Sequence, residues 1–257
     1  MKHDFIDSHS DINSVIHRLD PRAKAILIIA MVISIVLTNP KALISFALYG
    51  FLILILIFLS KIPISYILKR FIMVMPFILL IAIFLPFIKD GEALWSHSIF
   101  GFDLKITYEG LIIFWNVLIK ALLSMLCMTL LIASTKFTHL LKALGDLKLP
   151  KIFIMIFSFM YRYIFVLQDE LEKLKRAKDS RSAGKRRWLN IKALSNMLGV
   201  LFIKSYEKGE TVYLAMCSRG FDGNVKLLEY NKLAFSDIIF IVVILMFLVF
   251  INVFGRF

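Results

Sequence analysis

Long runs of uncharged apolar residues constrain this chain more than any other feature of its sequence. The clearest run is Ala42–Leu59, which carries no charged residue, and an apolar helix of about 20 residues is what a bilayer core requires. The composition agrees, because 60% of the 257 residues are hydrophobic and only 19% are charged, whereas soluble domains are less apolar and more charged. With 11 Gly, 6 Pro and 2 Cys, collagen-like and disulfide-stapled folds are excluded. The sequence therefore predicts an all-α, polytopic helical membrane protein.

About five transmembrane helices are predicted. The candidate spans are Ala25–Leu37, Ala42–Leu59, Phe71–Ile88, Leu111–Ser134 and Ala234–Phe254. The first two are separated by Thr38–Lys41, where the Asn-Pro pair predicts a tight turn. A further apolar stretch, Ile152–Leu167, is short and contains Arg162, so it fits either a span or an amphipathic helix at the membrane surface.

Lysine and arginine in the short flanks predict the orientation, because such residues are enriched on the cytoplasmic side. The N-terminal flank contains Lys2, Arg18, Arg22 and Lys24, whereas the turn between the first two spans contains only Lys41. We therefore expect a cytoplasmic N-terminus and a membrane domain of four spans over residues 1–134. A cytoplasmic coupling domain is predicted over 135–233, followed by a last transmembrane helix over 234–257.

The net charge of +13 is concentrated in the predicted cytoplasmic domain. Nine basic residues fall between Glu172 and Lys192, namely Lys173, Lys175, Arg176, Lys178, Arg181, Lys185, Arg186, Arg187 and Lys192. Cytoplasmic basic residues attract anionic lipid headgroups, so topology and membrane lipid account for part of this charge. Nucleic acid is not an expected partner, because no nucleic-acid-binding motif accompanies the patch.

Two long helices are predicted in this domain, over Lys151–Lys178 and about Leu189–Cys217. The first lacks Gly and Pro, and its first half is apolar whereas its second half is charged. The second repeats apolar residues at helical spacing. Such helices fit docking to another protein, and a solvated helical face is the alternative.

A related tripeptide stands near the end of each predicted helix: Ser180-Arg181-Ser182 and Ser218-Arg219-Gly220. In each, an arginine is flanked by small residues that let a partner approach the backbone closely. The guanidinium offers five donors in a rigid fork for carbonyls or carboxylates. Gly184 and Gly220 can adopt the positive φ that closes a helix.

Three stretches of the chain resemble one family, the transmembrane T component of energy-coupling factor (ECF) transporters, in particular its cobalt/nickel, CbiQ-type branch. They are His17–Lys24, with Asp20, Pro21 and Arg22; Leu149–Arg181, with Arg162 and Glu170; and Ala215–Phe221, with Ala215, Met216 and Phe221 beside the second tripeptide. The family's coupling motifs usually read Ala-Arg-Gly or Ala-Arg-Ser. Here Ser180 and Ser218 replace the alanine, and serine is nearly as small.

The resemblance implies a transport-coupling subunit rather than an enzyme. Each coupling motif would sit in a groove of one of two ABC ATPase subunits, which would hold ATP and Mg, and a separate S component would capture the substrate. A cobalt or nickel ion is the favoured substrate, and a vitamin is the alternative.

The residues themselves indicate no chemistry on this chain. The five His are scattered, the two Cys lie far apart, and no Gly-rich phosphate loop is present, so neither a metal site nor ATP hydrolysis is expected here. Two other classes stay open: a polytopic membrane enzyme acting on lipid, and a membrane scaffold. Asp20 and Pro21 also have a structural interpretation, as an N-cap followed by proline at the first helical position.

Overall fold

The computed structural model describes residues 14–40, 42–88, 93–99, 102–181, 187–223 and 235–254. The chain forms two compact units, each considered by itself. Leu144–Glu229 make up the first, here called the arm unit. Lys2–Ala143 and Tyr230–Phe257 make up the second, here called the bundle unit.

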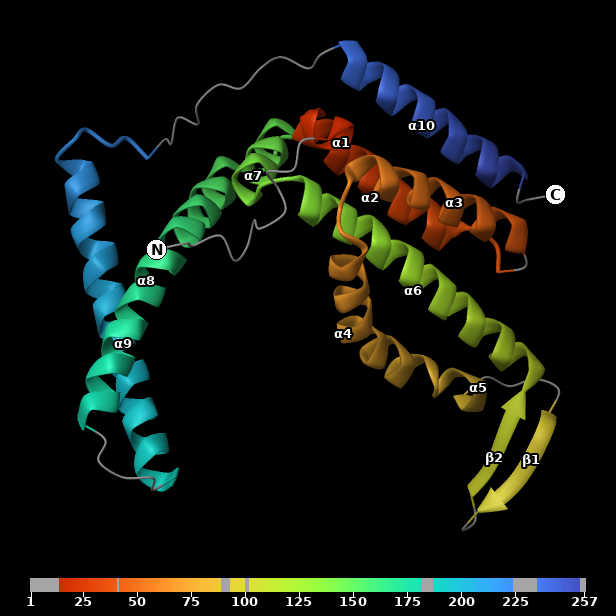
Figure 1. Cartoon of the computed structure of the whole chain (residues 1–257), viewed down its shortest axis with the longest axis horizontal. Helices are drawn as coiled ribbons and strands as arrows, with labels where there is room; N and C mark the ends of the chain where they lie inside the picture. The colour runs from red at the N-terminus through yellow and green to blue at the C-terminus, as the bar shows by residue number, and fades with distance from the viewer. Residues whose placement is uncertain are drawn as a thin grey trace. The chain divides into compact units, whose positions relative to one another are not determined.

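The predicted all-α class is confirmed (Figure 1). The bundle unit contains α1 (Val15–Arg18), α2 (Pro21–Leu37), α3 (Leu43–Ser60), α4 (Ile64–Ala82), α5 (Leu85–Ile88), α6 (Tyr108–Ser134) and α10 (Phe235–Phe254). The arm unit contains α8 (Lys151–Arg181) and α9 (Arg187–Cys217). The division between the units falls within α7 (Phe137–Asp146).

Within the described ranges, four helices are long and apolar enough, by length and composition, to cross a membrane: α3, α4, α6 and α8. A shorter apolar stretch, Asp237–Val253, lies within α10. The expectation of about five spans is therefore confirmed in number. The members differ in two places. Helix α8 contains the ambiguous stretch Ile152–Leu167 and is among the candidates, whereas α2, with 17 residues, is shorter than a typical span.

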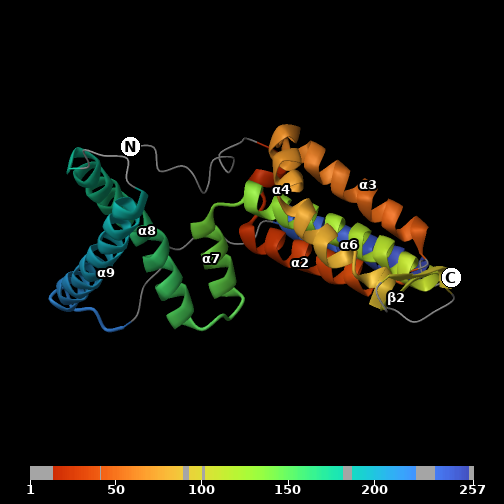
Figure 2. The same ribbon diagram turned by 90° about the horizontal axis from the view of Figure 1, so that it is seen from below.

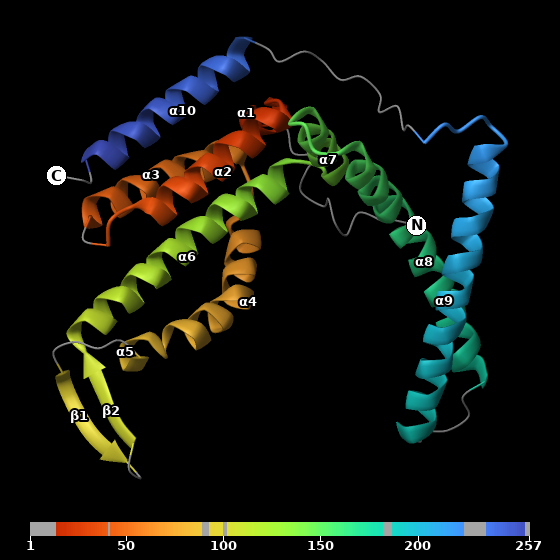
Figure 3. The ribbon, with the colours of Figure 1, turned by 180° about the vertical axis from the view of Figure 1, so that it is seen from behind.

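The core of the bundle unit lies between α2, α3, α6 and α10, which run side by side (Figures 2 and 3). Its centre is formed by fully buried side chains that include Met31, Ile35, Tyr49, Cys127 and Ile251. The outward faces are also apolar, as Phe58 at 87% exposure illustrates. A bundle that is apolar all round is expected when its surroundings are lipid.

The start of α2 has the predicted cap. Asp20 is the N-cap, its side chain accepts a hydrogen bond of 2.8 Å from the backbone N–H of Arg22, and Pro21 occupies the first helical position. Proline loses nothing at this position, because its missing N–H would have no partner inside the helix.

The end of α2 is closed mostly by side chains. The last carbonyls of a helix have no partner within it. Thr38 donates through its hydroxyl to Ser34 O at 2.8 Å and through its N–H to Ile35 O at 3.4 Å. Lys120 of α6 donates to Val36 O at 2.8 Å and to Thr38 O at 2.7 Å. The lysine that the sequence places within a span is thus a partner for backbone carbonyls.

Asn116 extends this contact to the turn between α2 and α3. It lies one helical turn before Lys120, and its amide donates to Pro40 O at 2.8 Å. The predicted helical hairpin is present. Pro40 lies in its turn, before α3 begins at Leu43. The Pro40 carbonyl is available to Asn116 because no N–H of α3 donates to it.

A second lysine joins the opposite ends of α2 and α6. Lys24 is only 4% exposed, and its Nζ donates to Ser134 O at 3.0 Å and to His17 O at 3.2 Å. Ser134 is the last residue of α6. Each helix of this antiparallel pair therefore supplies a lysine to carbonyls at or near the other's C-terminus, where the helix dipole favours a cation.

The third predicted span, Phe71–Ile88, differs in its bounds. α4 begins earlier, at Ile64, and ends at Ala82, and the short helix α5 follows. Pro76 lies inside α4, whereas Pro86 is the second residue of α5, where it breaks no helical hydrogen bond. The run of apolar residues alone did not reveal this break.

A two-stranded antiparallel hairpin, β1 (Ala93–Ile99) and β2 (Phe102–Thr107), precedes α6 and was not predicted. Thr107, at its end, donates through its hydroxyl to Pro86 O at 3.3 Å. The hairpin therefore leads directly into the junction of α5 and α6.

We expect Lys120→Met to destabilise the bundle by about 1–3 kcal/mol, because the carbonyls of Val36 and Thr38 lose their donor in apolar surroundings. Thermal unfolding in detergent can be followed by thiol labelling of the buried Cys127 in a Cys217→Ser background. Lys69→Met, at an exposed lysine of α4, is the matched control. Equal melting temperatures for the two variants would contradict the expectation.

Gly110→Ala should also destabilise the bundle, by about 1–3 kcal/mol. A Cβ at Gly110 would lie 2.7 Å from Pro86 Cα and 2.8 Å from Thr107 Oγ1, so α5 would have to move. Gly50→Ala is the control, because its Cβ would lie 3.8 Å from Leu123 Cδ2, an ordinary contact. The same labelling assay measures both, and a Gly110→Ala protein as stable as Gly50→Ala would refute the close approach.

Candidate functional site

The two arginine tripeptides are placed by α8 and α9 of the arm unit. α8 follows a turn in which Lys148 has a φ of 68° and Pro150 precedes the first helical residue. It continues without Gly or Pro to Arg181. α9 ends at Cys217. Both predicted helices are confirmed, and each is longer than predicted.

The first tripeptide terminates α8. Arg181 is the last helical residue and is exposed. The hydroxyl of Ser180 donates back to Arg176 O at 2.9 Å and Ala177 O at 3.2 Å, so it is turned toward its own helix. Ser182 and Gly184 lie outside the described residues, and whether Gly184 closes the helix therefore stays a prediction.

The second tripeptide forms the C-terminal cap of α9. Gly220 has a φ of +79°, and its N–H donates to Cys217 O at 3.0 Å while the N–H of Phe221 donates to Met216 O at 3.1 Å. This pair of hydrogen bonds is the Schellman motif, in which glycine is favoured because a Cβ is strained at positive φ. The predicted role of Gly220 is confirmed.

Arg219 occupies the C-cap position of this motif and is exposed. Ser218 donates through its hydroxyl to Ala215 O at 3.0 Å, as Ser180 does toward its own helix. Both tripeptides therefore present an exposed arginine at a helix end beside a serine whose hydroxyl is satisfied by backbone. Small size, rather than hydrogen bonding to a partner, is what these serines offer.

Both arm helices expose large apolar side chains. Ile152 on α8 is 58% exposed, and Phe202 and Tyr206 on α9 are 73% and 71% exposed. Among the described side chains of α8 and α9, Ile154 alone is buried. Apolar surface of this extent is typical of a docking or membrane surface.

One ion-pair cluster joins α8 to α9. Glu170, in the charged second half of α8, accepts from Lys204 of α9 at 2.9 Å and from Lys173 at 2.7 Å. These hydrogen bonds, the one from Lys173 being the stronger, lower the pKa of the Glu170 carboxyl to about 2. The carboxylate is therefore ionised throughout the physiological range.

The supporting residues of the resemblance are divided between the two units. Asp20, Pro21 and Arg22 form the start of α2 in the bundle unit. Arg162 is exposed on α8, Ala215 and Met216 lie in the last turn of α9, and Phe221 belongs to its C-terminal cap. The structural interpretation of Asp20 and Pro21 as a helix start is therefore confirmed by the cap geometry.

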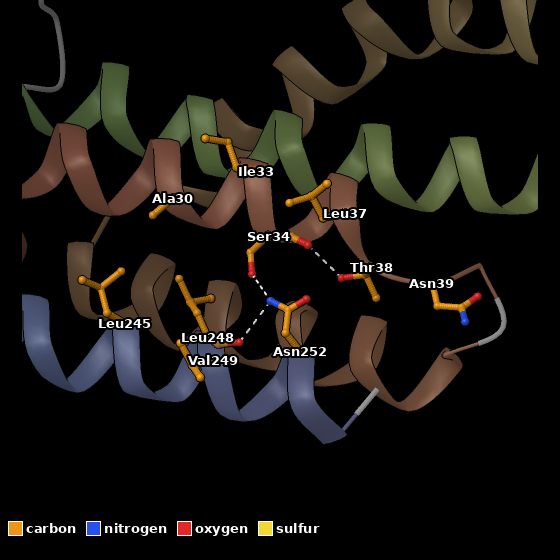
Figure 4. Close-up of a pocket in the computed structure, with 10 residues that line it drawn as sticks. All are labelled: Ala30, Ile33, Ser34, Leu37, Thr38, Asn39, Leu245, Leu248, Val249 and Asn252. Atoms are coloured by element: carbon orange, nitrogen blue, oxygen red, sulfur yellow. Dashed lines mark hydrogen bonds between the residues drawn. The ribbon is translucent and has the colours of Figure 1, made fainter. Parts of the chain in front are cut away.

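A cavity of about 570 Å³ lies between α2 and α10 (Figure 4). Its polar lining is occupied by its own network, since Asn252 donates to Ser34, to Leu248 O at 3.2 Å and, outside the lining, to Tyr49 OH at 3.1 Å. This network ties α10 to α2 and α3. The polar groups of Asn252 and Ser34 at the cavity therefore hydrogen-bond one another and hold the helices together.

Within the part of the chain that the structure describes, no group of three or more His, Cys, Asp or Glu side chains is placed to hold a metal ion. Cys127 is buried and Cys217 is exposed, and both are free thiols.

The sequence did not predict two contacts that hold helices together. Glu170 and Lys204 lie 34 positions apart, and Lys24 and Ser134 lie 110 positions apart. Contacts over such separations leave no repeating pattern in the sequence. In the sequence, Lys24 is a topology signal next to an apolar run, and a charge at the edge of a span also fits a partner for a helix terminus.

Comparison with known proteins places the chain among transport proteins. Residues 12–230 match the family described as "CbiQ: Cobalt transport protein". The energy-coupling factor transporter transmembrane protein EcfT of Macrococcus caseolyticus is 30% identical, over 86% of this chain and 86% of its own length. EcfT of Lactococcus lactis is 29% identical, over 88% and 87%. A putative fused cobalt transport protein, CbiMQ, of Methanocorpusculum labreanum is 33% identical over 58% of this chain and 25% of its own length.

The two EcfT relatives match most of the chain, and the family match over residues 12–230 includes both arm helices. The chain is a multi-pass membrane protein and a transporter subunit rather than an enzyme. It belongs to the CbiQ family, as a transmembrane component of the energy-coupling factor type.

Proposed function

We propose that this chain couples ATP hydrolysis by two ABC ATPase subunits to substrate uptake through a separate S component. The observation that carries the proposal is the pair of exposed arginines, Arg181 and Arg219, each at the C-terminal end of a long arm helix. An arginine projecting from a helix end beside small residues can enter a groove and bind carbonyls or carboxylates at its floor.

Each motif would occupy a groove on one ATPase subunit, which would hold the ATP and Mg. ATP binding would close the ATPase pair, and the two arginines would carry this movement to α8 and α9. The arm helices would then displace the membrane helices and reorient the S component, so that the substrate is released inside. For the ATPases to shift the arm helices between two arrangements, they have to bind one arrangement more tightly than the other.

The orientation belongs to the same proposal. The N-terminus and residues 135–233 would lie in the cytoplasm of a prokaryotic cell, with residues 1–134 and 234–257 in the membrane. The apolar first half of α8, including Arg162, would lie at the membrane surface, where lysine and arginine reach the headgroups. The exposed apolar side chains of the arm helices support such contacts with lipid and partners.

The S component would determine the substrate. A cobalt or nickel ion is favoured because the family is described as cobalt transport proteins. A vitamin is the second candidate, since related EcfT proteins are named for energy coupling rather than for a substrate. Uptake assays with each S component encoded beside this chain would decide between them.

Arg181→Ala and Arg219→Ala should each weaken assembly with the ATPases by about tenfold or more, as expected for a central interface arginine. Copurification and ATP-driven uptake are the measurements. Arg176→Ala, at an exposed position of α8, is the matched control. Normal assembly and uptake in both arginine variants would contradict the proposal.

Gly220→Ala should reduce assembly by about fivefold or more, because alanine at positive φ costs about 1–2 kcal/mol and would alter the cap that presents Arg219. Gly220→Asn should be milder, since asparagine tolerates this conformation. Gly199→Ala, in the middle of α9 with open space around its Cβ, serves as control. Equal assembly of the two alanine variants would show that the cap is dispensable.

A further inference from the structure

Helices α8 and α9 pass each other in the arm unit (Figures 1 and 3), and Lys204 of α9 donates to the Glu170 carboxylate of α8 at 2.9 Å. Glu170 and Lys204 line a cleft of about 280 Å³ between the two helices. Val166 and Leu167 of α8 line it on one side, and Glu207 and Thr211 of α9 on the other. The two helices therefore meet at this level, and both continue beyond it toward their arginine motifs.

Side-chain packing does not determine the angle between these helices. No described side chain of α9 is buried, and among those of α8 only Ile154, near its start, is buried. Interdigitated apolar side chains normally fix a crossing angle. With so little burial, a directed polar contact at the crossing has a correspondingly larger influence on the angle.

The position of this contact makes it a pivot. Arg181 lies 11 positions after Glu170, and Arg219 lies 15 positions after Lys204. At about 1.5 Å per helical residue, these separations correspond to arms of roughly 16 and 22 Å. A rotation of about 10° at the crossing would move the two helix ends by about 3 and 4 Å, which is enough to break a hydrogen bond.

We infer that Glu170 is a positioning residue that, by binding Lys204, sets the crossing angle of α8 and α9 and so the separation of Arg181 from Arg219. Its consequence for transport rests on the proposed function, whereas the helix geometry is measurable without it. Lys173 holds the Glu170 carboxylate from its own helix, which leaves the second oxygen directed to α9.

Spin-label distance measurement on the full chain tests this role. One label is attached to the native, exposed Cys217 and the other to Ala177→Cys at an exposed position of α8, in a Cys127→Ser background. Glu170→Lys should shift or broaden the distance by about 3 Å or more. The charge exchange Glu170→Lys with Lys204→Glu should restore it, and Glu172→Lys, the same change two positions later, should leave it unaltered.

Uptake in the reconstituted transporter gives the second readout. Exposed ion pairs favour the paired geometry by up to about fivefold, and Glu170→Lys also adds repulsion from Lys173 and Lys204, so it should lower uptake by about fivefold, with recovery in the charge exchange. An unchanged distance in Glu170→Lys, or failure of the exchange to restore it, would overturn the positioning role. A changed distance with unchanged uptake would overturn its link to transport but not the helix geometry.

Discussion

Every backbone carbonyl at a helix end needs a donor, and in apolar surroundings that donor has to come from the protein. The antiparallel pair α2 and α6 meets this requirement reciprocally. Lys120 of α6 binds carbonyls at the end of α2, and Lys24 of α2 binds the last carbonyl of α6. Because a lysine donates to carbonyls near the C-terminal end of each helix, α2 and α6 cannot slide along one another. Helices α3 and α10 pack against this pair.

The arm unit differs from the bundle unit in how little its helices pack against each other. Its helices bury almost nothing of one another and expose apolar and basic side chains along their length. Such helices gain order from a partner rather than from their own packing. A rigid frame joined in sequence to two weakly packed helices suits a subunit that transmits movement, because the helices can change angle while the frame stays intact.

The sequence predicted the parts of the structure that depend on local patterns. Apolar runs revealed α3, α6 and α10, the absence of Gly and Pro revealed α8, and Gly220 revealed the cap of α9. It did not reveal the break between α4 and α5, because Ala82 and Leu85 lie in one continuous apolar run. It also missed the hairpin β1–β2. The long-range partners of Lys24, Glu170 and Asn252 depend on the fold, and no spacing within one sequence encodes them.

The proposed coupling role depends on partner contact at two helix ends of one unit. Hydrogen exchange of the chain, alone and with its ATPase subunits, measures that contact most directly. Protection on assembly should rise at residues 179–181 and 214–221 together, while the turn between α2 and α3 stays unchanged. Assembly that protects neither helix end, or only one of them, would contradict the assignment of Arg181 and Arg219 as the paired coupling residues.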